Sequence, residues 1–94
     1  MTKEEMDKLD VWLGENITDD GPMEGYTWYK PDWHPTTNDG QAIKCAEKTG
    51  LPYHINKLAI DNYFCEIGDS KSFAYENTMA LAVSLACKKA WGGK

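Results

Sequence analysis

The sequence contains no arginine. All ten of its basic residues are lysines, and 15 acidic residues give the 94-residue chain a net charge of −5. The guanidinium group is the usual planar donor for reading guanine and clamping phosphates, and DNA-binding proteins usually carry a basic face because phosphate neutralisation provides most of their affinity. The first twenty residues hold seven acids and two lysines, and the remainder holds eight of each. Neither part offers a basic face, so we expect no DNA binding.

Long apolar runs are also missing. No run approaches the roughly 20 apolar residues that a membrane-spanning helix needs, and the chain begins MTKEE, a charged stretch with no apolar segment behind it. We therefore expect neither a membrane span nor a signal peptide. The cysteines are odd in number, widely spaced and without a CxxC pair, so they predict no disulfide framework. They are Cys45, Cys65 and Cys87. This cysteine usage fits a reducing cytosol, and we expect a cytoplasmic location.

The sequence lacks any motif tied to a particular chemistry. It contains no nucleophile elbow, no phosphate-binding P-loop and no HExxH. Zinc binding by the cysteines with His34 and His54 is chemically conceivable, but structural zinc takes ligands paired a few residues apart. Each cysteine instead falls on a predicted apolar face, as small core residues do. We expect no metal, no cofactor and no catalytic residue. The alternative is a small enzyme whose site follows none of these motifs.

Residues 3–16 are predicted to form an amphipathic helix. Thr2 and Glu5 match the S/T-x-x-E capping box, in which each side chain accepts a hydrogen bond from the other residue's backbone N–H. Apolar residues then recur at helical spacing, and these are Met6, Leu9, Trp12, Leu13 and Ile17. The acids of the segment are expected on a solvated face. The alternative is that this face docks on a basic partner or mimics DNA.

The middle of the chain predicts a second helix followed by three strands. Residues 39–48 form the helix, with Asn38 and Gln41 as a weaker capping box and Thr36 and Thr37 as alternative caps. Gly50 stands where a left-handed residue ends a helix. Residues 52–60, 62–67 and 72–76 are β-prone segments separated by turn residues. They predict a meander of three antiparallel strands.

The last predicted helix covers residues 79–91 and is rich in alanine and other helix formers. Almost no charge precedes Lys88, so the helix should be buried on most sides, and its alanines allow close approach to a sheet. Residues 26–30 add a short edge strand or an ordered loop. The whole chain, residues 1–94, is thus predicted to be a single α+β domain. Its order is α-(β)-α-β-β-β-α, with helices packed on a three-stranded antiparallel sheet.

Two segments carry a resemblance to a known family. Residues 35–42 (PTTNDGQA) lead into the middle helix, and residues 76–82 (ENTMALA) open the terminal one. They are similar to the P-x-(S/T)-T-(D/N) and T-x-x-x-A-I-x-x-A-A-L-x-A patterns of the phage ABA sandwich domain family, small proteins of phages and prophages. The resemblance covers about residues 28–91, whereas the first helix departs from the family's alanine- and valine-rich pattern. It implies an α-β-α sandwich and a phage-encoded accessory protein, with no catalytic residues to carry over.

The most unusual local feature is an aromatic cluster just before the middle helix. Rigid rings beside a helix start could anchor a partner or stack a base while the helix amides bind an anion. The candidate binding residues are Trp28, Tyr29, Trp33, His34, Thr36 and Thr37. The alternative interpretation is that these rings cover the sheet and close a small core.

These observations favour a non-enzymatic binding or interaction module acting in host–phage biology. Its partner would be a host or phage protein. The alternative is a small-molecule binder, such as a sponge that sequesters a nucleotide signal of host defence, although the lack of arginine leaves phosphate capture to lysines and backbone amides. A homodimer is also possible, because a domain this small gains stability from association. The sequence does not show which surface would serve.

Overall fold

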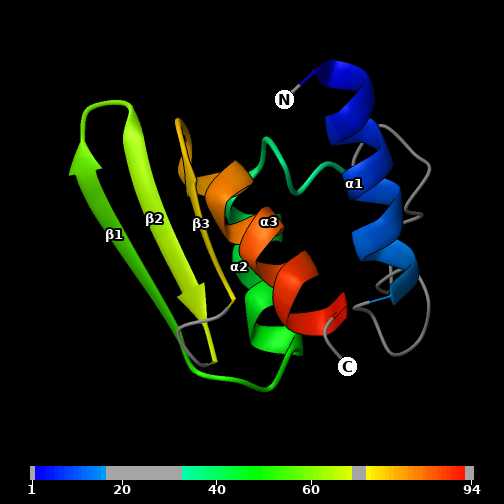
Figure 1. Ribbon diagram of the computed structural model, residues 1–94. Helices are drawn as coiled ribbons and strands as arrows, with labels where there is room; N and C mark the ends of the chain where they lie inside the picture. Colours follow the sequence, from blue (N-terminus) through cyan, green and yellow to red (C-terminus); the bar gives the residue numbers. More distant parts are fainter. Residues whose placement is uncertain (1, 17–32, 69–71, 93–94) are drawn as a thin grey trace.

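The structure is a computed structural model (Figure 1) that describes residues 2–16, 33–68 and 72–92. The elements run in the order α1 (Lys3–Asn16), α2 (Asp39–Lys48), β1 (Tyr53–Ala59), β2 (Asn62–Ile67), β3 (Phe73–Glu76) and α3 (Met79–Gly92). The predicted α+β class and its order of helices and antiparallel strands are confirmed. The short strand or loop expected at residues 26–30 lies outside the described residues.

The helix starts follow from local side-chain chemistry. The predicted capping box of α1 is present, because Thr2 N–H donates to Glu5 Oε1 at 3.1 Å and Glu5 N–H donates to Thr2 Oγ1 at 3.2 Å. At α2, Asn38 Oδ1 accepts from Gln41 N–H at 3.0 Å. The reciprocal bond differs from the prediction, since Gln41 Oε1 accepts from the N–H of His34 at 2.7 Å. Gln41 therefore ties the preceding loop to the helix.

The sheet is an antiparallel meander in the order β1-β2-β3. The chain enters it from α2 through Gly50, whose φ of +73° lies in the left-handed region, as predicted. In the centre of the sheet Cys65 lies opposite Ile55 on one side and Ala74 on the other. Cys65 and Ile67 of β2 are fully buried against the helices. The predicted alternation of β2 therefore places one face of the sheet in the core.

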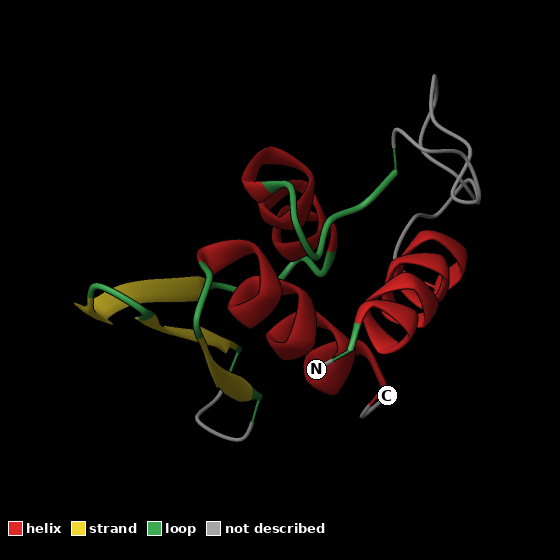
Figure 2. Ribbon diagram, turned by 90° about the horizontal axis from the view of Figure 1, so that it is seen from above, coloured by secondary structure: helices red, strands yellow, loops and turns green. Residues whose placement is uncertain are grey.

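All three helices lie on the same side of the sheet (Figures 1 and 2). α3 packs against every strand and also against α2 and α1, so it forms the centre of the molecule. α1 lies beyond α3, on the side away from the sheet. The opposite face of the sheet carries an aromatic cluster, Phe64, Phe73 and Tyr75, with ring centroids 4.9–6.1 Å apart. The described helices leave this face open.

The small residues of α3 permit its central position. Ala82, Ala86 and Cys87 have no exposed surface, and Leu81 and Ala80 are almost fully buried. The expectation that this helix is buried across the meander is confirmed. Although α3 is the most apolar helix, neither it nor any other helix among the described residues is long and apolar enough to cross a membrane.

One buried hydroxyl in α3 has no hydrogen-bond partner among the described residues. Ser84 is fully buried, and its Oγ makes no hydrogen bond there. Burying an unpaired hydroxyl costs about 1–3 kcal/mol. We therefore expect Ser84→Ala to raise the free energy of unfolding by about 1 kcal/mol, measured by urea denaturation. Thr36→Val is the contrasting variant, because the buried Thr36 hydroxyl donates to Asp10. That variant should lower stability, and a stability loss in Ser84→Ala would contradict the interpretation.

Candidate binding pocket

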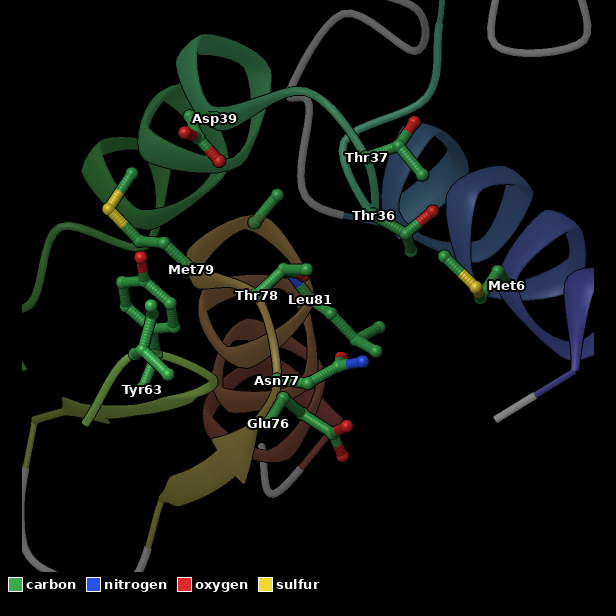
Figure 3. Close-up of a pocket in the computed structure, with 12 residues that line it drawn as sticks. Met6, Thr36, Thr37, Asp39, Tyr63, Glu76, Asn77, Thr78, Met79 and Leu81 are labelled. Atoms are coloured by element: carbon green, nitrogen blue, oxygen red, sulfur yellow. The ribbon is translucent and has the colours of Figure 1, made fainter. Parts of the chain in front are cut away.

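A pocket of about 570 Å³ opens where the first turns of all three helices meet the β1–β2 hairpin (Figure 3). Its volume falls within the range of pockets that hold small ligands, roughly 300–1,000 Å³. Met6 reaches it from α1, Asp39 from α2, Met79 from α3 and Tyr63 from β2. Segments far apart in the sequence therefore build one concave surface.

The lining combines apolar, uncharged polar and acidic side chains. The apolar group is Met6, Ile60, Tyr63, Met79, Ala80 and Leu81, and the uncharged polar group is Thr36, Thr37, Asn77 and Thr78. The charged residues are Asp39 and Glu76, and no lining residue is basic. In Figure 3 Asp39 and Glu76 lie on opposite sides of the pocket, with Met79, Thr78 and Leu81 between them. The pocket thus has a mixed apolar and polar wall with an acid on either side.

The helix starts at the pocket are already capped. Asn38 Oδ1 accepts from Gln41 N–H in α2, and Thr78 Oγ1 accepts from Leu81 N–H at 3.3 Å in α3. A helix start carries a partial positive charge that favours a nearby carboxylate. Asp39 is the first residue of α2 and Glu76 closely precedes α3. A capping side chain thus bonds each helix start, and an acidic residue stands close to it in the sequence, which does not favour a bound phosphate.

A buried carboxylate fixes one wall of the pocket. Asp10 of α1 accepts two hydrogen bonds from Thr36, one from its backbone N–H at 2.9 Å and one from its hydroxyl at 3.1 Å. The backbone carbonyl of Asp10 also accepts from Trp33 Nε1 at 2.8 Å. These bonds join α1 to the loop that leads into α2. They hold Thr36 and Thr37 beside the pocket.

Asp10 corrects the expectation that the acids of the first helix form a solvated face. Its side chain is buried, with 6% of its surface exposed. Burial raises the pKa of Asp10 above its ordinary value, while the two hydrogen bonds from Thr36 act in the opposite direction. The hydrogen bonds from Thr36 therefore offset only part of the cost of burying this carboxylate.

The candidate residues of the aromatic loop differ in where the structure places them. Trp28 and Tyr29 lie outside the described residues, and His34 is half-buried. Trp33 is 4% exposed, and its indole N–H donates a hydrogen bond to the Asp10 carbonyl in α1. This corrects the expectation that the Trp33 ring forms an exposed binding surface, because burying the ring against the core stabilises the fold.

Of the other candidates, Thr36 and Thr37 both line the pocket. Thr36 is buried, with its hydroxyl committed to Asp10, whereas Thr37 is exposed. Sequence reasoning missed Met6, Tyr63 and Glu76 as pocket residues. Each fits an ordinary role in its own helix or strand, so no local signal could have identified them.

The cysteines do not supply a reactive group. All three are free and buried. Burial raises the pKa of Cys45 to about 12 and that of Cys65 to about 11, and it raises the pKa of Cys87 as well. The thiols therefore stay protonated at neutral pH and act as core residues, as predicted. Among the described residues, no three metal-ligating side chains come together.

Comparison with known proteins adds no relative. No protein-family model, curated protein or solved structure matches this chain significantly. The resemblance to the phage ABA sandwich domain family stays a prediction.

Proposed function

We propose that this chain is a non-enzymatic interaction module that binds a basic, partly apolar segment of a partner protein at the pocket. One observation carries the proposal. The pocket lining combines apolar and uncharged polar side chains with two carboxylates and contains no basic residue. Lysine or arginine side chains of a partner would meet Asp39 and Glu76, while apolar side chains would pack against Met6, Tyr63 and Met79.

The charge of the whole chain supports this choice of partner. The net charge is −5, and α1, which contributes Met6 to the pocket, carries Glu4 and Glu5 in its first turn. Both are exposed. An acidic surface speeds the approach of a basic partner, and added salt weakens this attraction. This extends the interpretation of the first helix as a surface for a basic partner.

The same lining argues against the nucleotide sponge. Phosphate groups need lysine, arginine or unsatisfied backbone amides, whereas this pocket presents two carboxylates and capped helix starts. We therefore place the nucleotide binder second. The assignment to host–phage biology, with action in the host cytoplasm and a host or phage protein as partner, is supported by the family resemblance of residues 28–91.

Binding of synthetic peptides, measured by fluorescence polarisation, tests the proposal. A labelled 12-residue peptide of alternating leucine and lysine is compared with two matched peptides, one with glutamate for lysine and one with serine for leucine. We expect only the leucine–lysine peptide to bind, with an affinity that falls as salt is raised from 50 to 300 mM. ATP, ADP and cyclic nucleotides should leave the melting temperature unchanged.

The double variant Asp39→Asn, Glu76→Gln should weaken peptide binding at least tenfold, about 1.4 kcal/mol. It removes both acidic charges of the pocket and keeps the side-chain shapes. The matched control is Glu47→Gln, because Glu47 is an exposed acid of α2 that does not line the pocket. That control should bind like the wild type. Equal binding by the double variant, or a preference for the glutamate peptide, would refute the proposal.

A further inference from the structure

The outer edge of β1 is unpaired within the described part of the chain. The sheet order is β1-β2-β3, so β1 has a strand on one side only. At seven residues it is the longest strand of the sheet. Figure 1 shows it at the outside of the sheet, away from the helices. An open strand edge is a template for pairing with another chain.

The hydrogen-bond pattern tells which residues face outward. Gly68 N–H donates to the carbonyl of Pro52 at 2.7 Å, and these residues continue the β1–β2 register in which Tyr53 lies opposite Ile67. In an antiparallel ladder the bonded and non-bonded pairs alternate. The backbone groups of residues 54 and 56 therefore point to β2. Those of Tyr53, Ile55 and Lys57 point to the open edge.

β1 and the residues beside it hold several exposed apolar side chains. Six large apolar side chains are exposed among the described residues, and four of them lie within residues 51–60. They are Leu51, Tyr53, Leu58 and Ile60. Tyr53 lies within residues 53–57, Leu51 and Leu58 flank this segment, and Ile60 also lines the pocket, so Tyr53 is the exposed apolar side chain that strand pairing would cover.

We propose that β1 pairs antiparallel with β1 of a second copy of this chain, with Ile55 at the two-fold axis and Tyr53 opposite Lys57 of the other copy. The two sheets then form one continuous sheet, and a two-fold axis perpendicular to it keeps the helices of both copies on the same side. The interface is isologous, as is usual for homodimers. This proposal is independent of peptide binding at the pocket.

The limits of the regular strand select this register. Pro52, which has no N–H, precedes the segment, and a β-bulge between Lys57 and Ala59 ends it. Only the register centred on Ile55 pairs all of residues 53–57. It also sets the His54 side chain opposite Asn56 on the other face.

Charge is compatible with a second copy as the occupant. Lys57 is the one formal charge within residues 53–57 at pH 7, and the proposed register places it opposite a tyrosine. A register centred on Lys57 would bring two lysines together, which is unfavourable. The net charge of −5 lies elsewhere on the chain, so it does not oppose contact at this edge.

Sedimentation equilibrium of the full chain tests the proposal. We expect the mean mass to rise with concentration from 10.6 kDa toward twice that value. Lys57→Pro deletes an outward N–H without removing a bond to β2, and it should raise the dimer dissociation constant at least tenfold. Lys57→Thr is the matched control, because it removes the same charge but keeps the N–H, and it should still dimerise. Circular dichroism verifies that each variant is folded.

Oxidative cross-linking tests the register. Ile55→Cys places two thiols at the axis, where Cα atoms of a bonded pair lie about 5.5 Å apart, within disulfide range. Asn56→Cys is the control, because its two copies would be diagonal neighbours about 7–8 Å apart. Both cross-linking variants are made in a Cys65→Ala background, because Cys65 lies directly opposite Ile55 in the β1–β2 pair and would otherwise compete for the new thiol at residue 55. We expect a cross-linked dimer for Ile55→Cys and little for Asn56→Cys.

Three results would overturn the proposal: a monomer at every concentration, a dimer unaffected by Lys57→Pro, or preferential cross-linking at residue 56. A monomer that binds an extended peptide along β1 would also overturn the dimer proposal. It would show that the edge serves a different chain. Peptide binding at the pocket is measured separately, so failure of the dimer leaves the pocket proposal standing.

Discussion

Replacing Asp10 with alanine is expected to lower the free energy of unfolding by about 3 kcal/mol. The substitution leaves the N–H and hydroxyl of the buried Thr36 without an acceptor. Each buried polar group that loses its partner costs about 1–3 kcal/mol. Urea denaturation followed by circular dichroism measures the change. The loss of stability should be greatest in α1, because Asp10 links this helix to the loop before α2.

Asp10→Asn is the control that separates shape from charge. Its amide oxygen can accept from the Thr36 N–H and its NH₂ can donate to the Thr36 hydroxyl, so it should lose far less stability than Asp10→Ala. A loss equal to that of the alanine variant would show that the charge, rather than the hydrogen bonds, holds the loop.

The same control predicts a pH dependence. Burial raises the folded-state pKa of Asp10, so the native protein holds this proton more tightly than the unfolded chain does. Linkage then makes this contribution to stability complete below the unfolded pKa and lost as pH rises through the folded pKa. The wild type should therefore gain stability relative to Asp10→Asn as the pH is lowered through that window. A relative loss at low pH would contradict the direction of the shift.

Replacing Ala86 with leucine should lower the free energy of unfolding by about 2–3 kcal/mol. Ala86 has no exposed surface, and α3 is enclosed by the sheet, α2 and α1. Extra methylene groups in a packed core displace its neighbours, at a typical cost of 1–3 kcal/mol. Chemical denaturation gives the magnitude. Because α3 touches every strand, this variant should destabilise the whole fold and not one segment.

Ala86→Gly serves as the control for the helix itself. It adds no volume and should cost about 1 kcal/mol through helix propensity. A larger loss for glycine than for leucine would mean that space remains around residue 86. The small residues of α3 would then have no role in close packing.

Much of the local structure could be predicted from the sequence. The bounds of α1, α2 and β2 agree with the predicted segments, because caps such as Thr2 with Glu5 and alternation such as that around Cys65 act over a few residues. The left-handed conformation of Gly50 is predictable for the same reason, because a helix that ends in this conformation favours a residue without a Cβ.

The candidate site was less predictable. Thr36 and Thr37 are candidate binding residues as well as alternative helix caps, and both line the pocket, but the partner of Thr36, Asp10, is 26 residues away along the chain. Asp10 lies four residues after Met6 and three before Leu13, so helical spacing places it on the apolar face of α1, but the sequence does not identify Thr36 as its partner. Likewise, the sequence around Trp33 does not indicate whether its ring is exposed or buried.

The sequence by itself determined where the helices and strands form and that α3 must be buried, because these depend on local caps, periodicity and hydrophobicity. Tertiary packing alone decided that the helices share one side of the sheet, that Asp10 meets Thr36 and that acids and apolar side chains from distant segments meet at one pocket. The physical reason is that such contacts depend on how the faces of separate elements fit together. Hydrophobicity shows that a face must be covered but does not specify by which element.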